Sequence, residues 1–304
     1  YYTVKEDKPD EIPKGYEYSN DVYRVTITIG EAEGKDNKLT VTKQIAKEGS
    51  EDPVDTIVFY NTYKATGSIE LTGKKEVKDF TGELKDGAFN FIVTENGEKV
   101  ATGKNDKDGK ITFDKIQYVY DGSNSNVLGK HTYTISEVQP ETGDSYIYDK
   151  TTRKVVVEVK DKGDGTLDAS IVTGADETTN KDISDVDIDA ENNIVVKKFV
   201  NEEMGISFRK TDIADKEIEG ATLTLYEYKD GKKGAEVTHW ETKKDETHVV
   251  TSGLVAGNSY ILEETKVPDG YVKADPIVFK INNDAERSVE IVSGGQKDKN
   301  GNIV

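Results

Sequence analysis

The chain has 304 residues, 33% of them charged and 34% hydrophobic, and its 41 basic and 59 acidic side chains give a net charge of -18. This acidic balance argues against binding to nucleic acid or to an anionic membrane surface, since both attract a basic face. Cysteine is absent, which excludes disulfides, thiol catalysis and zinc–thiolate sites. No apolar run reaches the roughly 18 residues of a membrane-spanning helix, so no membrane insertion is expected.

Short runs of alternating residues, rich in β-branched and aromatic types, recur along the chain. Their period of two predicts strands, and the Asp-Gly pairs between such runs favour hairpin turns. No amphipathic helical pattern of useful length occurs, so we predict an all-β fold built of sandwiches. Examples of the runs are 22–29, 155–159 and 221–226, and examples of the Asp-Gly pairs are 108–109, 164–165 and 230–231.

Two segments of the chain repeat each other, 2–63 and 133–203. Each opens with Tyr-Thr, an apolar residue and, two positions later, Glu. Each then has two tyrosines (Tyr16 and Tyr18, Tyr146 and Tyr148), a long strand pattern and a closing apolar run that contains Asn. The residues before the second copy, about 64–132, have no counterpart before the first. We therefore expect the chain to begin inside a domain.

A third unit of different pattern begins near Gly205. It opens with Lys210-Thr211-Asp212, continues through Gly220-Ala221 and closes with the stretch 260–271. The boundaries near 63 and 204 lack Pro-rich or Gly-rich linkers, which favours stacked over freely tethered domains.

These motifs carry a family resemblance. The third unit resembles the Cna B-type (SpaA-like) domain of Gram-positive surface proteins, and its 260–271 stretch is similar to the pilin E-box. The two repeats resemble streptococcal pilin isopeptide-linkage domains. The expected domains are 1–63, the rear part of a linkage domain whose front half is absent, 64–203, a complete linkage domain, and 204–304, a Cna B-type domain with its last strand cut short.

The resemblance implies tandem immunoglobulin-like β-sandwiches, stacked end to end, in a subunit of a sortase-assembled pilus. It also implies spontaneous Lys–Asn isopeptide bonds, each with a catalytic acid beside it. In such a reaction the lysine must be neutral to attack, and the acid must be protonated to move protons. Burial favours both states, because a low dielectric lowers a lysine pKa and raises a carboxyl pKa.

In the second unit, period-two alternation places three polar residues on inward faces of three strands. Lys75 shares a face with Val77, and Glu137 and Asn201 share faces with neighbouring apolar residues. The resemblance makes Lys75 and Asn201 the linked pair and Glu137 the catalyst. The structural alternative is a solvated strand edge or a slipped register, in which these residues face water.

In the third unit, the resemblance gives the reactive lysine as Lys210 and the acid as Glu264. Alternation directs Glu263 to the other face. The acceptor is expected in a final strand just past the end of the chain, with Asn302 and Asn300 as fallback candidates.

In the first unit, Glu6 and Asn61 match Glu137 and Asn201. Their lysine is expected to precede Tyr1. No metal or cofactor is expected, because His131, His239 and His248 fall in no metal-binding spacing.

The function predicted from these features is structural: a pilus subunit at the extracellular cell surface, anchored to the cell wall and joined to other pilin subunits through sortase-made linkages. Its only catalysis is the single-turnover formation of its own isopeptide bonds. The alternative is a host-binding adhesin built from the same modules, with host surface ligands as partners. A turnover enzyme such as a glycosidase needs paired carboxylates, and nothing in the sequence singles out such a pair.

Overall fold

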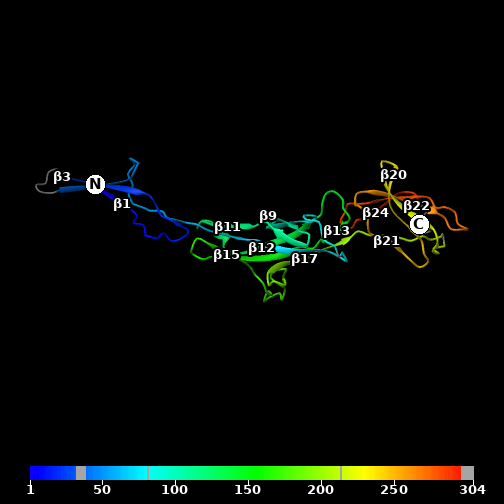
Figure 1. Cartoon of the computed structure of the whole chain (residues 1–304). Helices are drawn as coiled ribbons and strands as arrows, with labels where there is room; N and C mark the ends of the chain where they lie inside the picture. The colour runs from blue at the N-terminus through cyan, green and yellow to red at the C-terminus, as the bar shows by residue number, and fades with distance from the viewer. Residues whose placement is uncertain (32–38, 81, 213, 296–304) are drawn as a thin grey trace.

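The computed structural model describes residues 1–31, 39–80, 82–212 and 214–295. Within these ranges the chain forms 24 strands and one short 3₁₀ turn, Ser125–Val127. The strands fall into three groups that follow one another in a row (Figure 1): a first group, β1–β5, a middle group, β6–β17, and a third group, β18–β24. None of the described residues belongs to a helix that could cross a membrane.

The first group has one antiparallel sheet, ordered β1-β3-β4, and a separate β2–β5 pair. Its buried hydrophobic side chains are Tyr23 and Ile45. Much of the apolar surface of β3 and β4 is exposed, including Ile29 at 63% and Val41 at 65%. The strands are β1 (Tyr2–Lys5), β2 (Tyr16–Glu17), β3 (Val22–Glu31), β4 (Leu39–Lys47) and β5 (Thr62–Tyr63).

The middle group contains a ten-stranded sheet, which surrounds one large core, and a β6–β11 pair that contributes to the same core. The sheet runs β13-β17-β7-β10-β9-β8-β12-β14-β15, with β16 paired to β17. The strands are β6 (Ala65–Ile69), β7 (Thr72–Val77), β8 (Asn90–Glu95), β9 (Glu98–Asn105), β10 (Lys110–Phe113), β11 (Ile116–Tyr120), β12 (Gly129–Val138), β13 (Tyr146–Ile147), β14 (Arg153–Asp161), β15 (Leu167–Ile171), β16 (Val186–Ile188) and β17 (Ile194–Glu203).

Strands β7 and β17 lie side by side and run parallel, although they come from opposite ends of the middle group. Phe199 is opposite Lys75 and Asn201 is opposite Val77. A register shift between Val196 and Phe199 inserts one extra residue in β17, and such a bulge turns the following side chains to the other face. As a result Val196, Phe199 and Asn201 are all buried.

The third group has a five-stranded sheet, ordered β20-β19-β22-β23-β24, and a β18–β21 pair. Its core includes Trp240, Leu254, Tyr260 and Phe279. The strands are β18 (Ile206–Phe208), β19 (Thr222–Lys229), β20 (Lys232–Glu241), β21 (His248–Val250), β22 (Ser259–Lys266), β23 (Ile277–Ile281) and β24 (Val289–Ser293).

The groups contact one another directly at both junctions. At the first, the Tyr63 hydroxyl donates a 2.7 Å hydrogen bond to Asp161 Oδ1. At the second, a Cβ on Gly143 would lie 1.5 Å from the carbonyl oxygen of Ala256, so only glycine fits there. This direct packing agrees with the stacking expected from the missing linkers.

The fold class predicted from the sequence is confirmed: the chain is all-β, with tandem sandwich domains. The runs at 22–29, 155–159 and 221–226 lie in β3, β14 and β19. The Asp230-Gly231 pair forms a two-residue hairpin with positive φ at both positions, 53° and 75°, as a type I′ turn requires. Residues 57–61, the closing apolar run of the first copy, form no strand, and no described strand pairs with them.

We expect protease to cut the first group of the purified chain before the middle group. The first group buries few apolar side chains, whereas the middle group has a large continuous core, and sparsely packed regions open at lower free energy. Limited proteolysis with mass readout tests this. Survival of residues 1–63 beyond cleavage of 64–203 would contradict it.

Candidate functional site

Three polar side chains meet inside the core of the middle group. Glu137 accepts two hydrogen bonds, from Lys75 Nζ at Oε2 and from Asn201 Nδ2 at Oε1, both 2.8 Å long. The Lys75 and Glu137 side chains are 0% exposed, and so is Asn201. A single carboxylate therefore bridges an amine and a primary amide in a dry environment. A solvated strand edge, the alternative weighed from sequence, is wrong for these residues.

Each member of this trio comes from a different strand. Lys75 lies on β7, Glu137 on β12 and Asn201 on β17. The backbone of Lys75 is fixed by the β9–β10 turn, because its N–H donates to the carbonyl of Gly109. A Cβ on Gly109, which has φ 80°, would lie 2.2 Å from the Lys75 carbonyl oxygen. The turn can approach β7 this closely only because that position is glycine.

The surroundings of the trio are aromatic and apolar. Lys75 Nζ lies 4.7 Å from the ring centroid of Phe89, and Phe91 packs on Phe199 at 5.1 Å between centroids. Burial lowers the pKa of Lys75, although the adjacent Glu137 acts in the opposite direction. Burial raises the pKa of Glu137, again against the influence of Lys75. Both directions favour the neutral pair over the ion pair.

The carbonyl of the Asn201 side chain has a partner that sequence analysis missed. The backbone N–H of Asp149 donates a 2.8 Å hydrogen bond to Asn201 Oδ1. A backbone donor leaves no trace in residue type, so periodicity could not have found it. The arrangement polarises the amide, because Nδ2 donates to Glu137 while Oδ1 accepts from Asp149.

The first group repeats part of this geometry. Asn61 Nδ2 donates to Glu6 Oε1 at 2.7 Å, and Ser19 N–H donates to Asn61 Oδ1 at 2.8 Å. The second carboxylate oxygen, Glu6 Oε2, is buried and has no hydrogen-bond partner among the described residues. In the middle group the corresponding oxygen of Glu137 accepts from Lys75.

The third group brings together the lysine and acid expected there, but less tightly. Lys210 Nζ lies 3.6 Å from Glu264 Oε2, with side chains 15% and 1% exposed. Lys210 lies just past the end of β18, where strand pairing has stopped, and Glu264 Oε2 also accepts from the backbone N–H of Ala274 at 2.7 Å. Glu263 faces the other way, 2.9 Å from Lys233. The fallback acceptors Asn300 and Asn302 lie outside the described residues.

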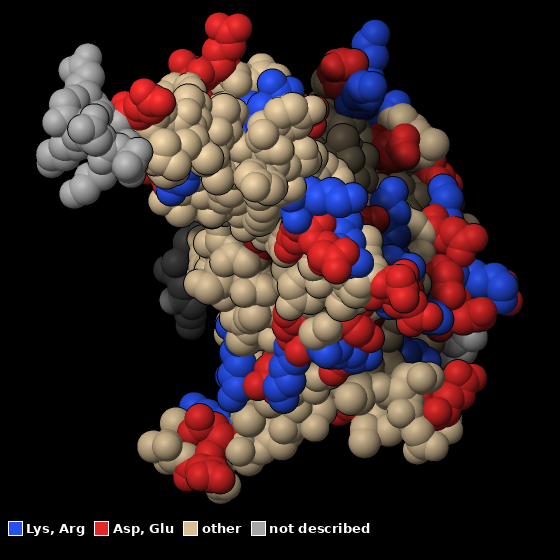
Figure 2. All heavy atoms as spheres, turned by 90° about the vertical axis from the view of Figure 1, so that its left-hand side faces the viewer, with Lys and Arg blue, Asp and Glu red and all other residues tan. Residues whose placement is uncertain are grey.

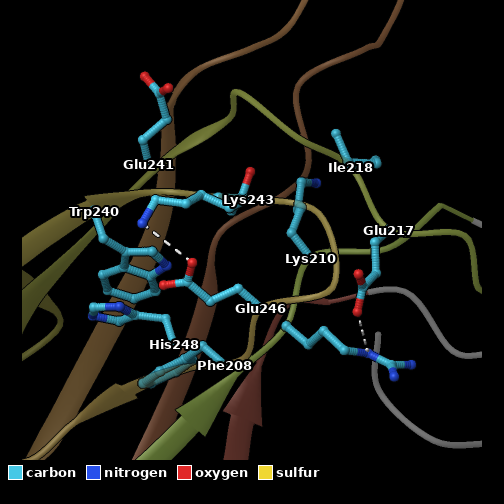
Figure 3. Close-up of a pocket in the computed structure, with 11 residues that line it drawn as sticks. Phe208, Lys210, Glu217, Ile218, Trp240, Glu241, Lys243, Glu246 and His248 are labelled. Carbon is cyan, nitrogen blue, oxygen red and sulfur yellow. Dashed lines mark ion pairs between the residues drawn. The ribbon is translucent and has the colours of Figure 1, made fainter.

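A small pocket in the third group is lined by Lys210, by other charged residues and by three aromatic residues, Phe208, Trp240 and His248 (Figure 3). Trp240 stacks on His248 at 4.3 Å between centroids and packs against Phe208 at 5.2 Å. Trp240 is only 8% exposed, so neighbouring side chains cover most of the indole. At the rim, Lys243 pairs with Glu246 at 3.2 Å. The aromatic residues serve the core of the third group and leave no open platform for a ligand.

The surface at the β1–β5 end of the row carries acidic and basic side chains interspersed, with broad areas that carry neither (Figure 2). One pair among these charges is Lys47 with Asp21, 2.6 Å apart. No cluster of His, Cys, Asp or Glu suited to a metal ion occurs among the described residues.

Comparison with known families gives two matches along the chain. Residues 71–184 match the model of the Spy0128-like isopeptide containing domain, FctA, and residues 204–294 match that of the prealbumin-like fold domain, SpaA. The first match includes Lys75 and Glu137, and the second includes Lys210 and Glu264. No curated protein matches the chain.

Several solved structures show a distant likeness. A C-terminal fragment of the pilus adhesin SpaC from Lactobacillus rhamnosus GG is 18% identical, with 75% of this chain and 88% of that chain covered and a TM-score of 0.39. The Bacillus anthracis TIE protein is 18% identical, with 88% and 41% covered and a TM-score of 0.34. The shaft pilin SpaA from Lactobacillus rhamnosus GG is 16% identical, with 72% and 95% covered and a TM-score of 0.24.

The order of the two family matches agrees with the order of the middle and third groups. Residues 71–184 match the Spy0128-like isopeptide domains and residues 204–294 the SpaA prealbumin-like domains, and together these matches support a pilin-type protein.

Proposed function

We propose that the chain is a structural part of a cell-surface pilus, locked by a self-generated isopeptide bond between Lys75 and Asn201. The observation that carries this proposal is the Glu137 carboxylate, which holds both reacting groups at 2.8 Å in a buried site. Such preorganisation replaces a bimolecular encounter with an intramolecular reaction. Glu137 is the proposed catalyst.

The reaction follows from the hydrogen bonds. In the neutral pair, the lone pair of Lys75 Nζ attacks Cγ of Asn201, and Glu137 gives its proton to Nδ2. The C–N bond of the amide breaks and ammonia leaves. Glu137 then recovers a proton from the lysine nitrogen, so the acid is unchanged and one new amide remains.

The proposed division into domains is 1–63, 64–203 and 204–304, and the proposed partners are other pilin subunits joined through sortase-made linkages outside the chain. Location at the cell surface follows from the pilin-type domains. The adhesin alternative requires an exposed ligand platform. The described aromatic pocket at Trp240 is filled by its own neighbours and does not favour it.

We further propose that Glu6 and Asn61 form the acceptor half of a second linkage site. A strand that carries the attacking lysine would pair with residues 57–61. The support is the buried, unpartnered Glu6 Oε2, at the position where Glu137 accepts from Lys75. For the third group, we propose Lys210 and Glu264 as the lysine and acid of a third site.

The intact mass of the purified chain should fall short of the sequence mass by one ammonia if only the middle site reacts. Glu137→Gln keeps the shape and one oxygen that can accept from Asn201 Nδ2, but its amide nitrogen can neither accept a hydrogen bond nor shuttle the proton, so it should slow ammonia loss by roughly 10²–10⁴-fold. Glu76→Gln is the matched control, because Glu76 neighbours Lys75 on β7 but faces outward to Lys198. Equal rates in wild type and Glu137→Gln would exclude Glu137 as the catalyst.

The bond should also raise the stability of the middle group. It closes a loop of well over a hundred residues, which by analogy with a disulfide is worth about 5 kcal/mol. Hydrogen exchange of the core amides in β8 and β12 measures this as the difference between bonded wild type and unbonded Glu137→Gln. Equal protection in the two proteins would contradict the stabilising role.

The second site can be tested with a peptide that carries this chain's own lysine strand. A synthetic peptide of residues 69–79 should couple to the chain, raising its mass by that of the peptide less one ammonia. Asn61→Ala should abolish the adduct, because it removes the electrophilic amide. An adduct that persists in Asn61→Ala, or none with wild type, would count against Asn61 as an acceptor.

A further inference from the structure

The amide N–H that faces the acceptor carbonyl is repeated in two groups of the chain. Asp149 N–H donates to Asn201 Oδ1, and Ser19 N–H donates to Asn61 Oδ1, each at 2.8 Å. When an amine attacks a carboxamide, negative charge develops on this oxygen. A fixed N–H at that point stabilises the charge, as in an oxyanion hole.

The position of the Asp149 N–H depends on how its loop is held. From within the middle group, Asp149 Oδ2 accepts from Val200 N–H at 3.1 Å and from Arg153 at 3.1 Å. Its Oδ1 accepts from Thr151 N–H at 2.9 Å. These bonds fix the Asp149 side chain and the chain segment that follows it. The residues before Asp149, 144–148, include β13, which pairs with β17 inside the middle group, and they also contact the third group, where Ala256 N–H donates to the carbonyl of Asp144.

The third group holds that preceding segment through Arg287. The guanidinium donates to Asp144 Oδ1 at 2.9 Å and to the carbonyl of Tyr146 at 2.8 Å. Asp144 Oδ2 in turn accepts from the hydroxyl of Tyr148, the residue directly before Asp149. The Arg287 side chain is only 2% exposed, so these contacts are shielded from water.

Arg287 has an unusual backbone conformation for an arginine, which indicates that its side chain is needed at this position. Its φ is 53°, and the other described non-glycine residues with positive φ are all Asp or Asn, which tolerate this region best. The first junction has a related contact. The segment that leads to Ser19 packs on the next group, where a Cβ on Gly15 would lie 2.7 Å from Gly165 Cα.

We propose that Arg287 is a positioning residue for the Lys75–Asn201 reaction: through Asp144 and Tyr148 it places the Asp149 N–H against the Asn201 carbonyl. Docking of the third group therefore accelerates bond formation in the middle group. This inference rests on the proposed isopeptide function. The bonds made and broken are those of that reaction, since Arg287 and the Asp149 N–H exchange no proton with the reactants.

The experiment measures ammonia loss over time in newly synthesised full chain, quenched in denaturant and analysed by intact mass. Arg287→Ala should slow the loss at least tenfold, because small misplacements of catalytic groups cost rate steeply. Arg287→Lys should recover part of it. Glu286→Ala is the matched control, since it removes the exposed Lys150–Glu286 pair across the same junction and should react at the wild-type rate.

Folding of the third group is followed in the same samples by fluorescence of Trp240, the single tryptophan of the chain, which is buried in that group. A slower reaction in Arg287→Ala with native Trp240 fluorescence supports the inference. An unchanged rate overturns it while leaving the isopeptide function standing, whereas absence of ammonia loss in wild type overturns both. Should Arg287→Ala fail to fold, Asp144→Asn tests the same contact from the middle group, and a wild-type rate there overturns the inference.

Discussion

The buried carboxylate of Glu137 is the constraint on which the middle group depends. Burial removes hydration and so favours the neutral amine and the neutral acid, and these buried polar groups are tolerated only when they are fully hydrogen-bonded. Here both oxygens of Glu137 are used, one by Lys75 and one by Asn201. Three strands must keep their registers for these bonds to exist. A slip of one residue in any of them would turn a polar side chain outward and leave the others unpaired in the core.

The first group shows how much of this arrangement is encoded locally. Tyr2 pairs with Val25 as Tyr133 pairs with Val155, so the strand that leads to the acid in the first group has the same register as the strand that carries it in the middle group. Asn61 and the Ser19 N–H then fall into place around Glu6 without any lysine. The acid, the acceptor and the backbone donor are thus positioned by the rear half of the fold. A strand that supplied a lysine, as proposed above, would add to a site that is already oriented.

Sequence periodicity predicted which side chains of the site face the core. It could not predict the β-bulge, the backbone donor or the contacts between groups. Alternation with Leu71 and Val77 predicted that Lys75 faces the core, and the Lys75 side chain is fully buried. The bulge between Val196 and Phe199 could not be predicted, because nothing in the local composition marks which residue is left unpaired. The Asp149 N–H and the Arg287 contacts were also missed, since one is backbone and the other joins residues 143 positions apart. Residues 57–61 have the composition of a strand, but a strand forms only where a partner lies beside it.

The parallel alignment of β7 and β17 has a mechanical consequence. The chain enters β7 from the side of the first group and leaves β17 toward the third, so a pull on the two ends acts at opposite ends of this strand pair. The strands are then loaded in shear, and their hydrogen bonds must yield together instead of unzipping one at a time. An amide between Lys75 and Asn201 would lie across that sheared pair. The applied force would then pass through two adjacent strands and bypass β8–β16, where extension would otherwise begin.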